Sequence, residues 1–342
     1  YDHLGGRKIL PGTNSLNLLN DLRGNPLQKR LKKGFAYSDC WVEDARLVVL
    51  TARDAFENGA DVRTRTECVG LQRSTDHWSM ELVTNGETKI EQAKVLVNAA
   101  GPWVDPVTAL YDQSSSAAKL RLVKGSHIVI NRKFEGEHSY IFQNKDGRII
   151  FAIPYEHDFT LIGTTDQLWS YEEGAAKISD NEIDYLCTAA SEYFSEPVER
   201  EHIQWTYAGV RPLFDDKSQS ASTVTRDFVF DYNDENGAPV LSIFGGKITT
   251  YRVLAHKAIK TLKSALGTTT DDWTADAALP GGNFSVEGFD ALVTEYSRLW
   301  PFVKQAVIRR LVRAYGTDTA KILNDAKEPS DLGQYFGAQW SN

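Results

Sequence analysis

Four basic side chains could carry chemistry, because each lies where a predicted strand meets a turn. They are His127 in Lys124-Gly125-Ser126-His127, Arg211 in Gly209-Val210-Arg211-Pro212, Arg226 in Thr225-Arg226-Asp227, and Lys247 in Gly245-Gly246-Lys247. An arginine makes two charge-assisted hydrogen bonds to one oxyanion, and a lysine supplies a point charge. The two arginines and the lysine could together hold a small phosphorylated molecule. The histidine could take a hydroxyl proton near neutral pH while the adjacent carbon gives its hydride to a cofactor.

Each of these residues also has an ordinary structural interpretation. Arginines at such positions are often salt-bridge or capping residues, and a strand histidine is often simply hydrogen-bonded. Hydrophobic periodicity does not show whether the four side chains converge. No serine-histidine-aspartate elbow and no paired metal ligands stand beside them in the sequence, so no metal site is expected.

The residues around Lys247 predict a strand, a glycine turn and a helix in succession. The apolar run 239–244 reads as a buried strand, Gly245 and Gly246 allow a sharp turn, and a helical pattern opens at Thr249. The free N–H groups and the positive dipole end of that helix would face the carboxyl edge of the strand. A phosphate or the electron-rich edge of a reduced flavin would suit this turn. An ordinary helix start with an exposed lysine is the alternative.

A second strand end has the same character. The apolar core that starts at Val95 finishes in the small residues Ala99, Ala100 and Gly101. A buried parallel strand looks like this where it reaches a ligand, because bulky side chains would block approach. Trp103 could cover such a site, although a plain strand terminus explains the same residues.

The remaining pattern predicts the elements that must position these side chains. Successive strands without intervening helices predict an antiparallel sheet, which is the candidate substrate domain. We expect these strands over 120–124, 127–131, 139–143, 148–154 and 160–164. Further expectations are one or two short helices over 16–31, helices over 44–59, 180–194 and 249–265, a hairpin over 78–90 with its turn at Asn85-Gly86, pairing of 228–232 with 240–244, and a helical tail.

Composition bounds the function. The chain has 342 residues, 42% hydrophobic and 25% charged, which is ordinary for a soluble globular protein of two or three domains. A net charge of −8 argues against a nucleic-acid-binding protein. The three widely spaced cysteines fit a reducing compartment. The basic cluster from Lys29 to Lys33 could meet an anionic membrane surface, or it could be a solvated surface.

Several longer motifs resemble those of one family. They are Tyr1-Asp2-His3-Leu4-Gly5, Tyr37-Ser38-Asp39-Cys40-Trp41-Val42, Val95-Leu96-Val97-Asn98-Ala99-Ala100-Gly101-Pro102-Trp103, Arg121-Leu122-Val123-Lys124-Gly125-Ser126-His127-Ile128, Leu161-Ile162-Gly163-Thr164-Thr165-Asp166, Gly209-Val210-Arg211-Pro212-Leu213 and Phe244-Gly245-Gly246-Lys247-Ile248-Thr249-Thr250-Tyr251-Arg252. In this order they resemble the bacterial FAD-dependent, quinone-linked (aerobic) glycerol-3-phosphate dehydrogenases. The matches run from Tyr1 to about Gly337.

The resemblance implies an α/β (α+β) fold with a partial FAD-binding, Rossmann-like domain of the D-amino-acid-oxidase type. It places an antiparallel substrate (cap) domain at 1–46 and 114–204, the FAD-binding domain at 47–113 and 205–278, and a shortened C-terminal helical domain at 283–342. The implied reaction oxidises sn-glycerol 3-phosphate to dihydroxyacetone phosphate, passes a hydride to FAD and then passes electrons to ubiquinone. The resemblance also implies a cytoplasmic enzyme. Such an enzyme could contact the inner face of the cytoplasmic membrane peripherally and could form a homodimer.

The resemblance also assigns roles to residues. His127 and Arg211 would be catalytic, and Arg211, Arg226 and Lys247 would bind the substrate phosphate. The residues expected at the cofactor are Ala99, Gly101, Trp103, Gly245, Gly246, Lys247, Ile248 and Thr249. The family's Gly-x-Gly-x-x-Gly fingerprint for the FAD pyrophosphate is absent from these 342 residues. We therefore expect a fragment that by itself binds FAD weakly or not at all and is inactive.

Two other functions remain open at this point. A glycerol-3-phosphate oxidase would share the phosphate site but hand its electrons to oxygen, and the motifs barely separate it from a dehydrogenase. A catalytically silent scaffold or interaction domain would share the fold but hold no FAD.

Overall fold

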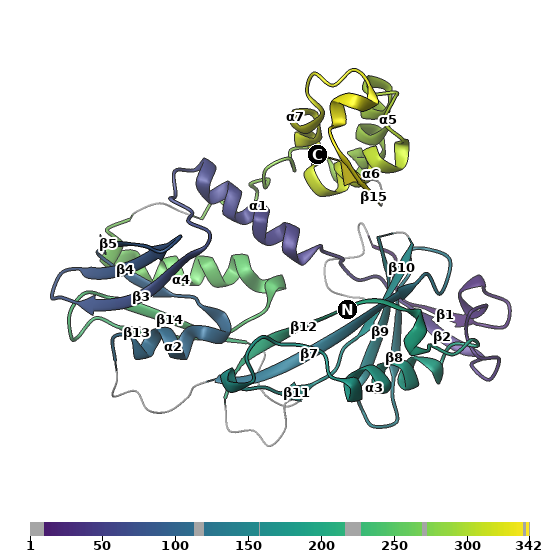
Figure 1. Ribbon diagram of the computed structural model, residues 1–342, viewed down its shortest axis with the longest axis horizontal. Coiled ribbons are helices and arrows are strands. Elements are labelled where there is room, and N and C mark those ends of the chain that lie inside the picture. The colour runs from purple at the N-terminus through teal and green to yellow at the C-terminus, as the bar shows by residue number, and fades with distance from the viewer. Residues whose placement is uncertain are drawn as a thin grey trace. The chain divides into compact units, whose positions relative to one another are not determined.

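The computed structural model describes residues 10–112, 120–156, 158–215, 227–268, 272–337 and 340–341. The chain forms two compact units, Tyr1–Cys40 with Glu67–Thr268, and Trp41–Thr66 with Thr269–Asn342. Figure 1 labels their helices and strands. The first unit contains every described residue of the expected site.

The larger sheet of the first unit is antiparallel and is built around one long strand, β7 (Leu120–Asn131). On one side β7 pairs with β12 (Ile203–Phe214), and on the other with β10 (Phe159–Gly163) and the short β11 (Gln167–Leu168). Beyond β10 lie β9 (Ile149–Tyr155) and β8 (Tyr140–Gln143). The antiparallel sheet expected from the sequence is therefore present. The expected break after Lys124 is wrong, because Gly125 and Ser126 continue the strand.

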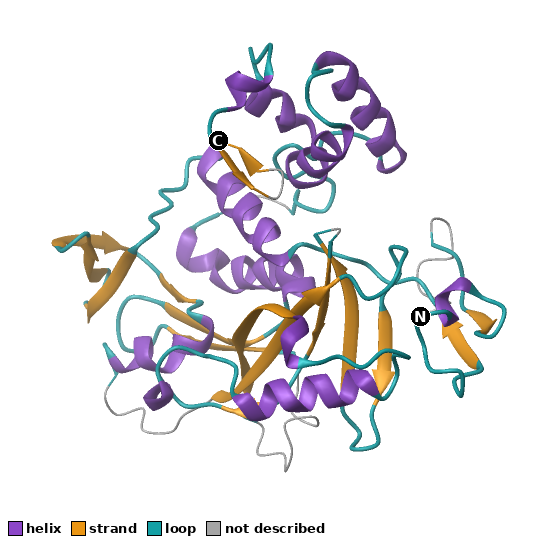
Figure 2. Ribbon diagram, turned by 45° about the vertical axis from the view of Figure 1, so that its right-hand side comes forward, coloured by secondary structure: helices purple, strands orange, loops and turns teal. Residues whose placement is uncertain are grey.

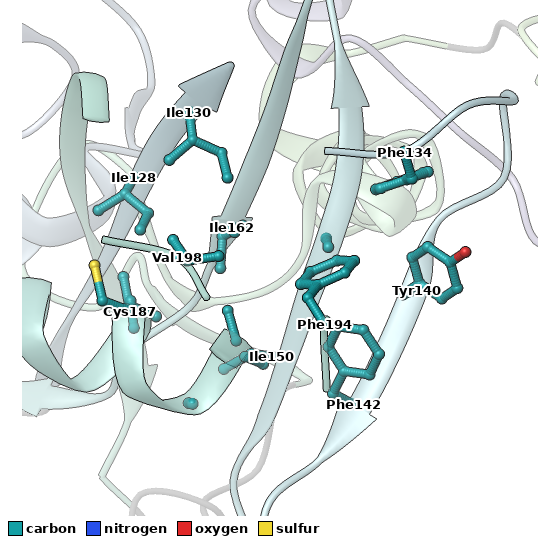
Figure 3. Packing of buried hydrophobic residues seen from close by; sticks show 14 of the residues in the cluster. Ile128, Ile130, Phe134, Tyr140, Phe142, Ile150, Ile162, Cys187, Phe194 and Val198 are labelled. Atoms are coloured by element: carbon teal, nitrogen blue, oxygen red, sulfur yellow. The ribbon is translucent and has the colours of Figure 1, made fainter. Parts of the chain in front are cut away.

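Helix α3 (Asp180–Ser191) covers one face of this sheet. Its apolar side, including Leu186 and Ala190, is fully buried against Ile128, Ile150 and Ile162 of the strands. Figure 3 shows this cluster together with the ring of Phe194. Ser179 caps the helix and forms a reciprocal capping box with Glu182. The glutamate of this Ser-x-x-Glu motif, Glu182, is therefore a buried carboxylate.

A smaller sheet of the first unit consists of β13 (Phe228–Asn233), β14 (Val240–Gly245) and β6 (Leu96–Asn98). β13 and β14 are antiparallel, as expected, whereas β14 and β6 run parallel. Helix α4 (Tyr251–Leu266) buries Ala258 and Leu262 against β14. The short helix α2 (Val104–Ala109) follows β6. Figure 2 shows these helices and strands by type.

The hairpin near residue 85 has the predicted turn. β4 (Trp78–Thr84) and β5 (Glu87–Ala93) are joined by Asn85 and Gly86, with φ of 53° and 84°. β3 (Thr66–Arg73) completes this sheet. The indole of Trp78 is fully buried and donates to the carbonyl of Pro239 at 2.9 Å, which ties the hairpin to the start of β14.

The helices expected over 16–31 are wrong. The chain forms β1 (Asn14–Asn17), one 3-10 turn (Leu22–Gly24) and β2 (Lys33–Ala36) instead. The segment folds back on itself so closely that a Cβ on Gly24 would lie 1.8 Å from the carbonyl oxygen of Leu18. Tertiary contact therefore overrides the helical pattern of the sequence.

The second unit is mainly helical. It contains α1 (Asp44–Glu57), α5 (Phe289–Leu299), α6 (Gln305–Tyr315) and α7 (Thr319–Leu323), followed by β15 (Tyr335–Gly337) and β16 (Trp340–Ser341). Trp300, Ile308 and Val312 are in its apolar core. Arg53 of α1 pairs with Asp318 at 2.8 Å, so contacts group α1 with the C-terminal helices. The domain boundaries expected from the resemblance stay a prediction.

Candidate active site

His127 lies on the face of the larger sheet opposite α3, where it is half-buried. Strand register places Tyr207 of β12 and Gly163 of β10 directly on either side of this histidine. The rings of His127 and Tyr207 are stacked, with centroids 4.9 Å apart and an interplanar angle of 10°. A Cβ on Gly163 would lie 2.1 Å from Cδ2 of His127, so only glycine leaves room for the ring there.

Arg211 lies on the same face as His127. Tyr207 is directly opposite His127, and Arg211 follows Tyr207 on β12 by four positions, so its side chain points to the same side. Its Nη1 pairs with Oδ1 of Asp166 at 2.7 Å, and its Nη2 donates to Oγ1 of Thr164 at 3.1 Å. The guanidinium reaches these partners across Gly125, where a Cβ would be 2.7 Å from Nη2. The pair with Asp166 is partly exposed, so it is weak and leaves the guanidinium accessible to an anion.

Two glycines separate the histidine from the arginine. Along the β7–β12 pair, the His127–Tyr207 position is followed by Gly125–Gly209 and then by Val123–Arg211. A Cβ on Gly209 would meet nothing within 4 Å, so open space lies above it. We call this surface, formed by Gly125 and Gly209, the glycine floor. The guanidinium of Arg211 lies over Gly125, whereas the space over Gly209 is open.

The second expected group gathers at the carboxyl edge of the smaller sheet. Because β6 and β14 are parallel, with Asn98 opposite Ser242, the segments that follow both strands start at the same edge. Ala99 and Trp103 are exposed there, and Gly101 has φ of +55° with open space around it. Asn98 fixes the turn by donating to the carbonyl of Val104 at 2.8 Å.

The glycine turn after β14 has the expected geometry. Gly245 and Gly246 have φ of +73° and +94°, which residues with a Cβ rarely adopt. Lys247, Ile248 and Thr249 follow and are exposed. A 3-10 turn (Ile248–Thr250) leads into α4, and neither start has a side-chain cap or an acidic first turn. The backbone N–H groups at the start of the 3-10 turn and of α4, together with the positive end of the helix dipole, therefore fit the electron-rich edge of a flavin.

The two groups belong to one unit and are joined through β12. A Cβ on Gly245 would lie 3.6 Å from the backbone nitrogen of Phe214, which is three residues beyond Arg211. Phe244 and Val104 also share one apolar cluster with Leu120 and Leu122 of β7. Arg226 lies outside the described residues. The phosphate-binding role of Lys247 and the roles of the other expected residues stay predictions.

Sequence reasoning missed several residues of this site. The sequence showed Gly163 and Asp166 only as parts of a motif and did not single out Tyr207, nor Glu182 on the other face of the sheet. The capping-box spacing of Ser179 and Glu182 was a usable signal for a buried acid. The partnership of Arg211 with Asp166 had no sequence signal, because the two residues are 45 positions apart.

The described part of the chain offers neither a metal site nor a membrane-spanning helix. No group of three or more histidine, cysteine, aspartate or glutamate side chains there could hold a metal ion. Within the same residues, each helix is too short or too polar to cross a bilayer.

Comparison with known proteins identifies the family. The model for FAD dependent oxidoreductases matches residues 11–252. The chain is 43% identical over 342 residues to D-erythritol 1-phosphate dehydrogenase of Brucella abortus, covering 99% of this chain and 68% of that protein. It is 41% identical over 344 residues to the aerobic glycerol-3-phosphate dehydrogenase of Escherichia coli, again with 99% and 68% covered. The chain thus spans about two thirds of the length of these relatives.

A solved structure has the same fold. The glycerol-3-phosphate dehydrogenase from Bacillus halodurans, complexed with FAD, matches with a TM-score of 0.78 and 27% identity, covering 92% of this chain and 64% of that one. The α/β architecture of this chain is therefore the FAD-binding fold of that family. The glycine turn, with its positive φ angles, and the uncapped helix start fit the FAD that the family uses. The chain belongs to the FAD-dependent oxidoreductases, in the group that contains the aerobic glycerol-3-phosphate dehydrogenases.

Proposed function

We propose that the protein oxidises sn-glycerol 3-phosphate to dihydroxyacetone phosphate with FAD as its cofactor. One observation carries the proposal: His127 and Arg211 share one face of one sheet, with the glycine floor between them. A base and a phosphate-binding cation on one face, with open space over Gly209 between them, suit a short polyol phosphate. The names of the relatives in Brucella abortus and Escherichia coli support the same substrate class.

Arg211 would bind the phosphate. In the structure its guanidinium already has a fixed direction, because Asp166 and Thr164 hold its two terminal nitrogens. A phosphate offers more charge than a partly exposed carboxylate, so it can compete with Asp166 for the guanidinium. Arg226 and Lys247 would add positive charge to the same anion.

His127 would accept the proton of the hydroxyl group that is oxidised. Stacking on Tyr207 and close contact with Gly163 fix the plane of the imidazole, so its ring nitrogens have defined directions. A positioned base of this kind contributes about 10² to 10⁴ in rate. FAD, when bound, supplies the acceptor for the hydride that leaves the carbon.

FAD would lie against the shared edge of β6 and β14. The residues that would hold it are Ala99, Gly101, Trp103, Gly245, Gly246, Lys247, Ile248 and Thr249. Lys247 and the uncapped helix start would favour negative charge on the cofactor's ring system. The 342 residues contain no Gly-x-Gly-x-x-Gly sequence, so we propose that they hold FAD weakly by themselves and are inactive unless FAD is added in excess.

A second substrate has a specific observation in its favour. The relative from Brucella abortus, at 43% identity, is named for D-erythritol 1-phosphate. Open space above Gly209 would admit a polyol one carbon longer than glycerol. Comparing kcat/KM for glycerol 3-phosphate and D-erythritol 1-phosphate on the flavin-loaded protein separates the two. If the protein oxidises neither substrate, the proposed function as a whole is contradicted.

Ubiquinone is the proposed electron acceptor. The name of the Escherichia coli relative, an aerobic dehydrogenase, is compatible with a respiratory acceptor. The measurement is the rate of reduction of a soluble ubiquinone analogue against the yield of hydrogen peroxide in air. A peroxide yield that matches substrate consumption would instead assign the oxidase function.

We also propose peripheral contact with the inner face of the cytoplasmic membrane through the β1–β2 segment. Leu22 and Phe35 are 83% and 75% exposed there, which is unusual for large apolar side chains. Lys29, Arg30, Lys32 and Lys33 are exposed in the same segment. Apolar groups beside clustered cations suit an anionic lipid surface.

A further inference from the structure

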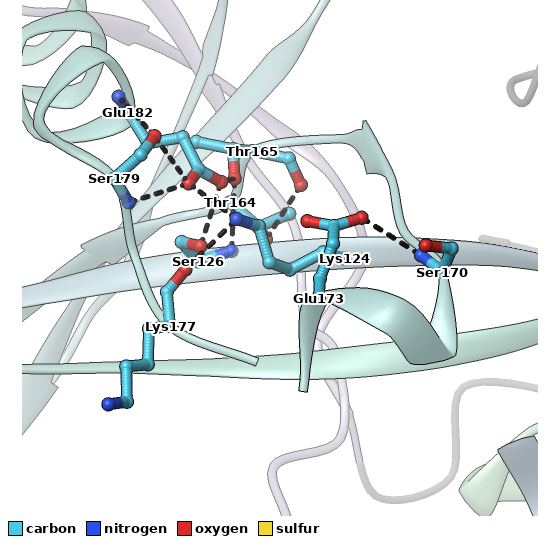
Figure 4. Close-up of polar contacts among 9 residues, drawn as sticks. All are labelled: Lys124, Ser126, Thr164, Thr165, Ser170, Glu173, Lys177, Ser179 and Glu182. Carbon is cyan, nitrogen blue, oxygen red and sulfur yellow. Dashed lines mark hydrogen bonds and ion pairs between the residues drawn. The ribbon is translucent and has the colours of Figure 1, made fainter. Parts of the chain in front are cut away.

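The face of the sheet opposite the active site contains a buried carboxylate, Glu182 of α3. Only 3% of this residue is exposed. Its Oε1 accepts from the hydroxyls of Ser126 at 2.8 Å and Thr165 at 2.7 Å. Its Oε2 accepts from the backbone N–H of Ser179 at 2.8 Å and pairs with Lys124 at 3.0 Å. Figure 4 shows these contacts converging on one group.

The contacts of Glu182 join the helix to two pieces of chain that carry active-site residues on their other side. Lys124 and Ser126 belong to β7, where they alternate with Gly125 and His127. Thr165 lies between Thr164 and Asp166, the two partners of Arg211. The carboxylate therefore touches the neighbours of the site residues but none of the site residues themselves.

Thr165 connects Glu182 to strand β7 and to the residues beside Arg211. Its hydroxyl donates to Glu182 and accepts from the backbone N–H of Ser126 at 3.0 Å, and its side chain is 1% exposed. A hydroxyl has one proton, so a carboxylate that must accept it fixes which way the hydroxyl points. That direction leaves the hydroxyl oxygen as the acceptor for β7. The segment Thr164–Asp166 is thereby held against the strand beside Arg211.

We propose that Glu182 is a positioning residue for Arg211: by holding Thr165 it fixes Thr164 and Asp166, and these two aim the guanidinium at the substrate anion. The inference rests on the proposed function for its kinetic consequence, and on the contacts alone for its structural consequence. A carboxylate that merely caps α3 and neutralises Lys124 would affect stability without affecting Arg211.

The test uses the flavin-loaded protein with two variants, Glu182→Gln and Thr165→Val. Thr165→Val removes the hydroxyl, and Glu182→Gln replaces one of the two acceptor oxygens by an N–H donor, so the side chain no longer accepts from all the partners of the carboxylate. We expect each to raise KM for the polyol phosphate about tenfold with a smaller change in kcat, a size typical of coupling within one polar network. In an Arg211→Lys background, which cannot form the same fork, each variant should add much less to KM.

Two variants on the same helix serve as controls. Asp184→Asn removes an ion pair with Arg200 that has no contact with the site, and Leu186→Ala destabilises α3 through its apolar face. Both should leave KM within about twofold, since neither alters the contacts of Arg211. An equal rise of KM in Leu186→Ala, or full additivity with Arg211→Lys, would overturn the proposal.

A second readout does not depend on turnover. Hydrogen–deuterium exchange of peptides spanning 163–168 should become faster in Glu182→Gln and Thr165→Val but stay unchanged in Asp184→Asn. Unchanged exchange in the first two variants contradicts the proposal even if the enzyme is active. Lack of turnover in the unaltered protein would instead contradict the proposed function, and exchange would still decide the role of Glu182.

Discussion

His127 lies across Gly163 so closely that a Cβ atom on the glycine would be 2.1 Å from Cδ2 of the ring. The two residues are directly opposite each other on β7 and β10, so neither strand can move aside without breaking its pairing. The position of the expected base is therefore set by an absent side chain on a neighbouring strand.

Gly163→Ala should displace the imidazole and lower kcat. A shift of about 1 Å at a catalytic group can cost on the order of 100-fold in rate. The measurement is steady-state turnover of the polyol phosphate beside a check of flavin content. Gly34→Ala is the matched control, because its methyl group would make only ordinary contact with Leu18, at 3.5 Å. Equal turnover of both variants contradicts the prediction.

Arg211→Ala should raise KM for the phosphorylated substrate on the order of 100-fold, since two hydrogen bonds to a charged group are lost. Flavin absorbance should not change, because the expected cofactor residues remain. Arg200→Ala is the control, as Arg200 pairs with Asp180 and Asp184 outside the site. Unchanged kinetics in Arg211→Ala would remove this arginine from the substrate site.

Glu182 should make stability depend on acid. Burial alone would raise its pKa, but hydrogen bonds from Thr165, Ser179 and Ser126, with Lys124, outweigh burial and lower the pKa from 4.5 to about 2. Because the pKa is lower in the folded state, the ionised carboxylate stabilises the fold at pH values above its unfolded-state pKa. This stabilisation is lost as the pH falls toward 2. The pKa shift corresponds to a contribution of about 3 kcal/mol to the free energy of unfolding at neutral pH.

Urea unfolding of the unaltered chain and of Glu182→Gln between pH 7 and pH 2 checks this. The difference in unfolding free energy should be greatest near neutral pH and should shrink as pH falls below about 4.5. Asp184→Asn is the control, because its carboxylate is exposed and screened by solvent. A difference that stays constant over this range contradicts the assignment.

The purified 342-residue chain should bind FAD weakly. Its absorbance spectrum after gel filtration should lack flavin bands, while titration with added FAD should give a shallow, saturable change. Lys247→Gln should weaken this binding further, because a charge near the cofactor edge is lost, and Lys29→Gln should not. A chain that retains one FAD per molecule through gel filtration would contradict the expectation.

Sedimentation with vesicles tests the proposed membrane contact. We expect the flavin-loaded protein to bind phosphatidylglycerol vesicles, more weakly at high salt, and to ignore phosphatidylcholine vesicles. Leu22→Ser with Phe35→Ser, or Lys32→Glu with Lys33→Glu, should reduce binding. Val286→Ser changes an equally exposed apolar residue of the other unit and should not. Equal loss in all variants would assign the binding elsewhere.

Local sequence signals predicted much of the fold, because they report on interactions within a few residues. The Asn85-Gly86 turn, the helix that begins at Asp180 and the glycine turn before Lys247 are of this kind, and all are present. The expected helices over 16–31 failed, since the close approach of Gly24 to Leu18 is a tertiary constraint.

The candidate site was predictable only in part, for the same physical reason. His127 and Arg211 could be selected by type and by motif, but their common face depends on the register of β7 with β12. No pattern within either strand encodes that register. The link from Arg211 through Thr165 to Glu182 crosses three elements, so it became visible only in the folded chain.

β7 places its buried polar residues and the expected base on alternate positions, with Ser126 facing α3 and His127 on the other face. Inserting or deleting a single residue upstream within this strand would exchange the two faces, bringing an imidazole against the carboxylate and a serine to the substrate. Natural variation in this strand should therefore consist of replacements alone, whereas the turns at either end can change in length.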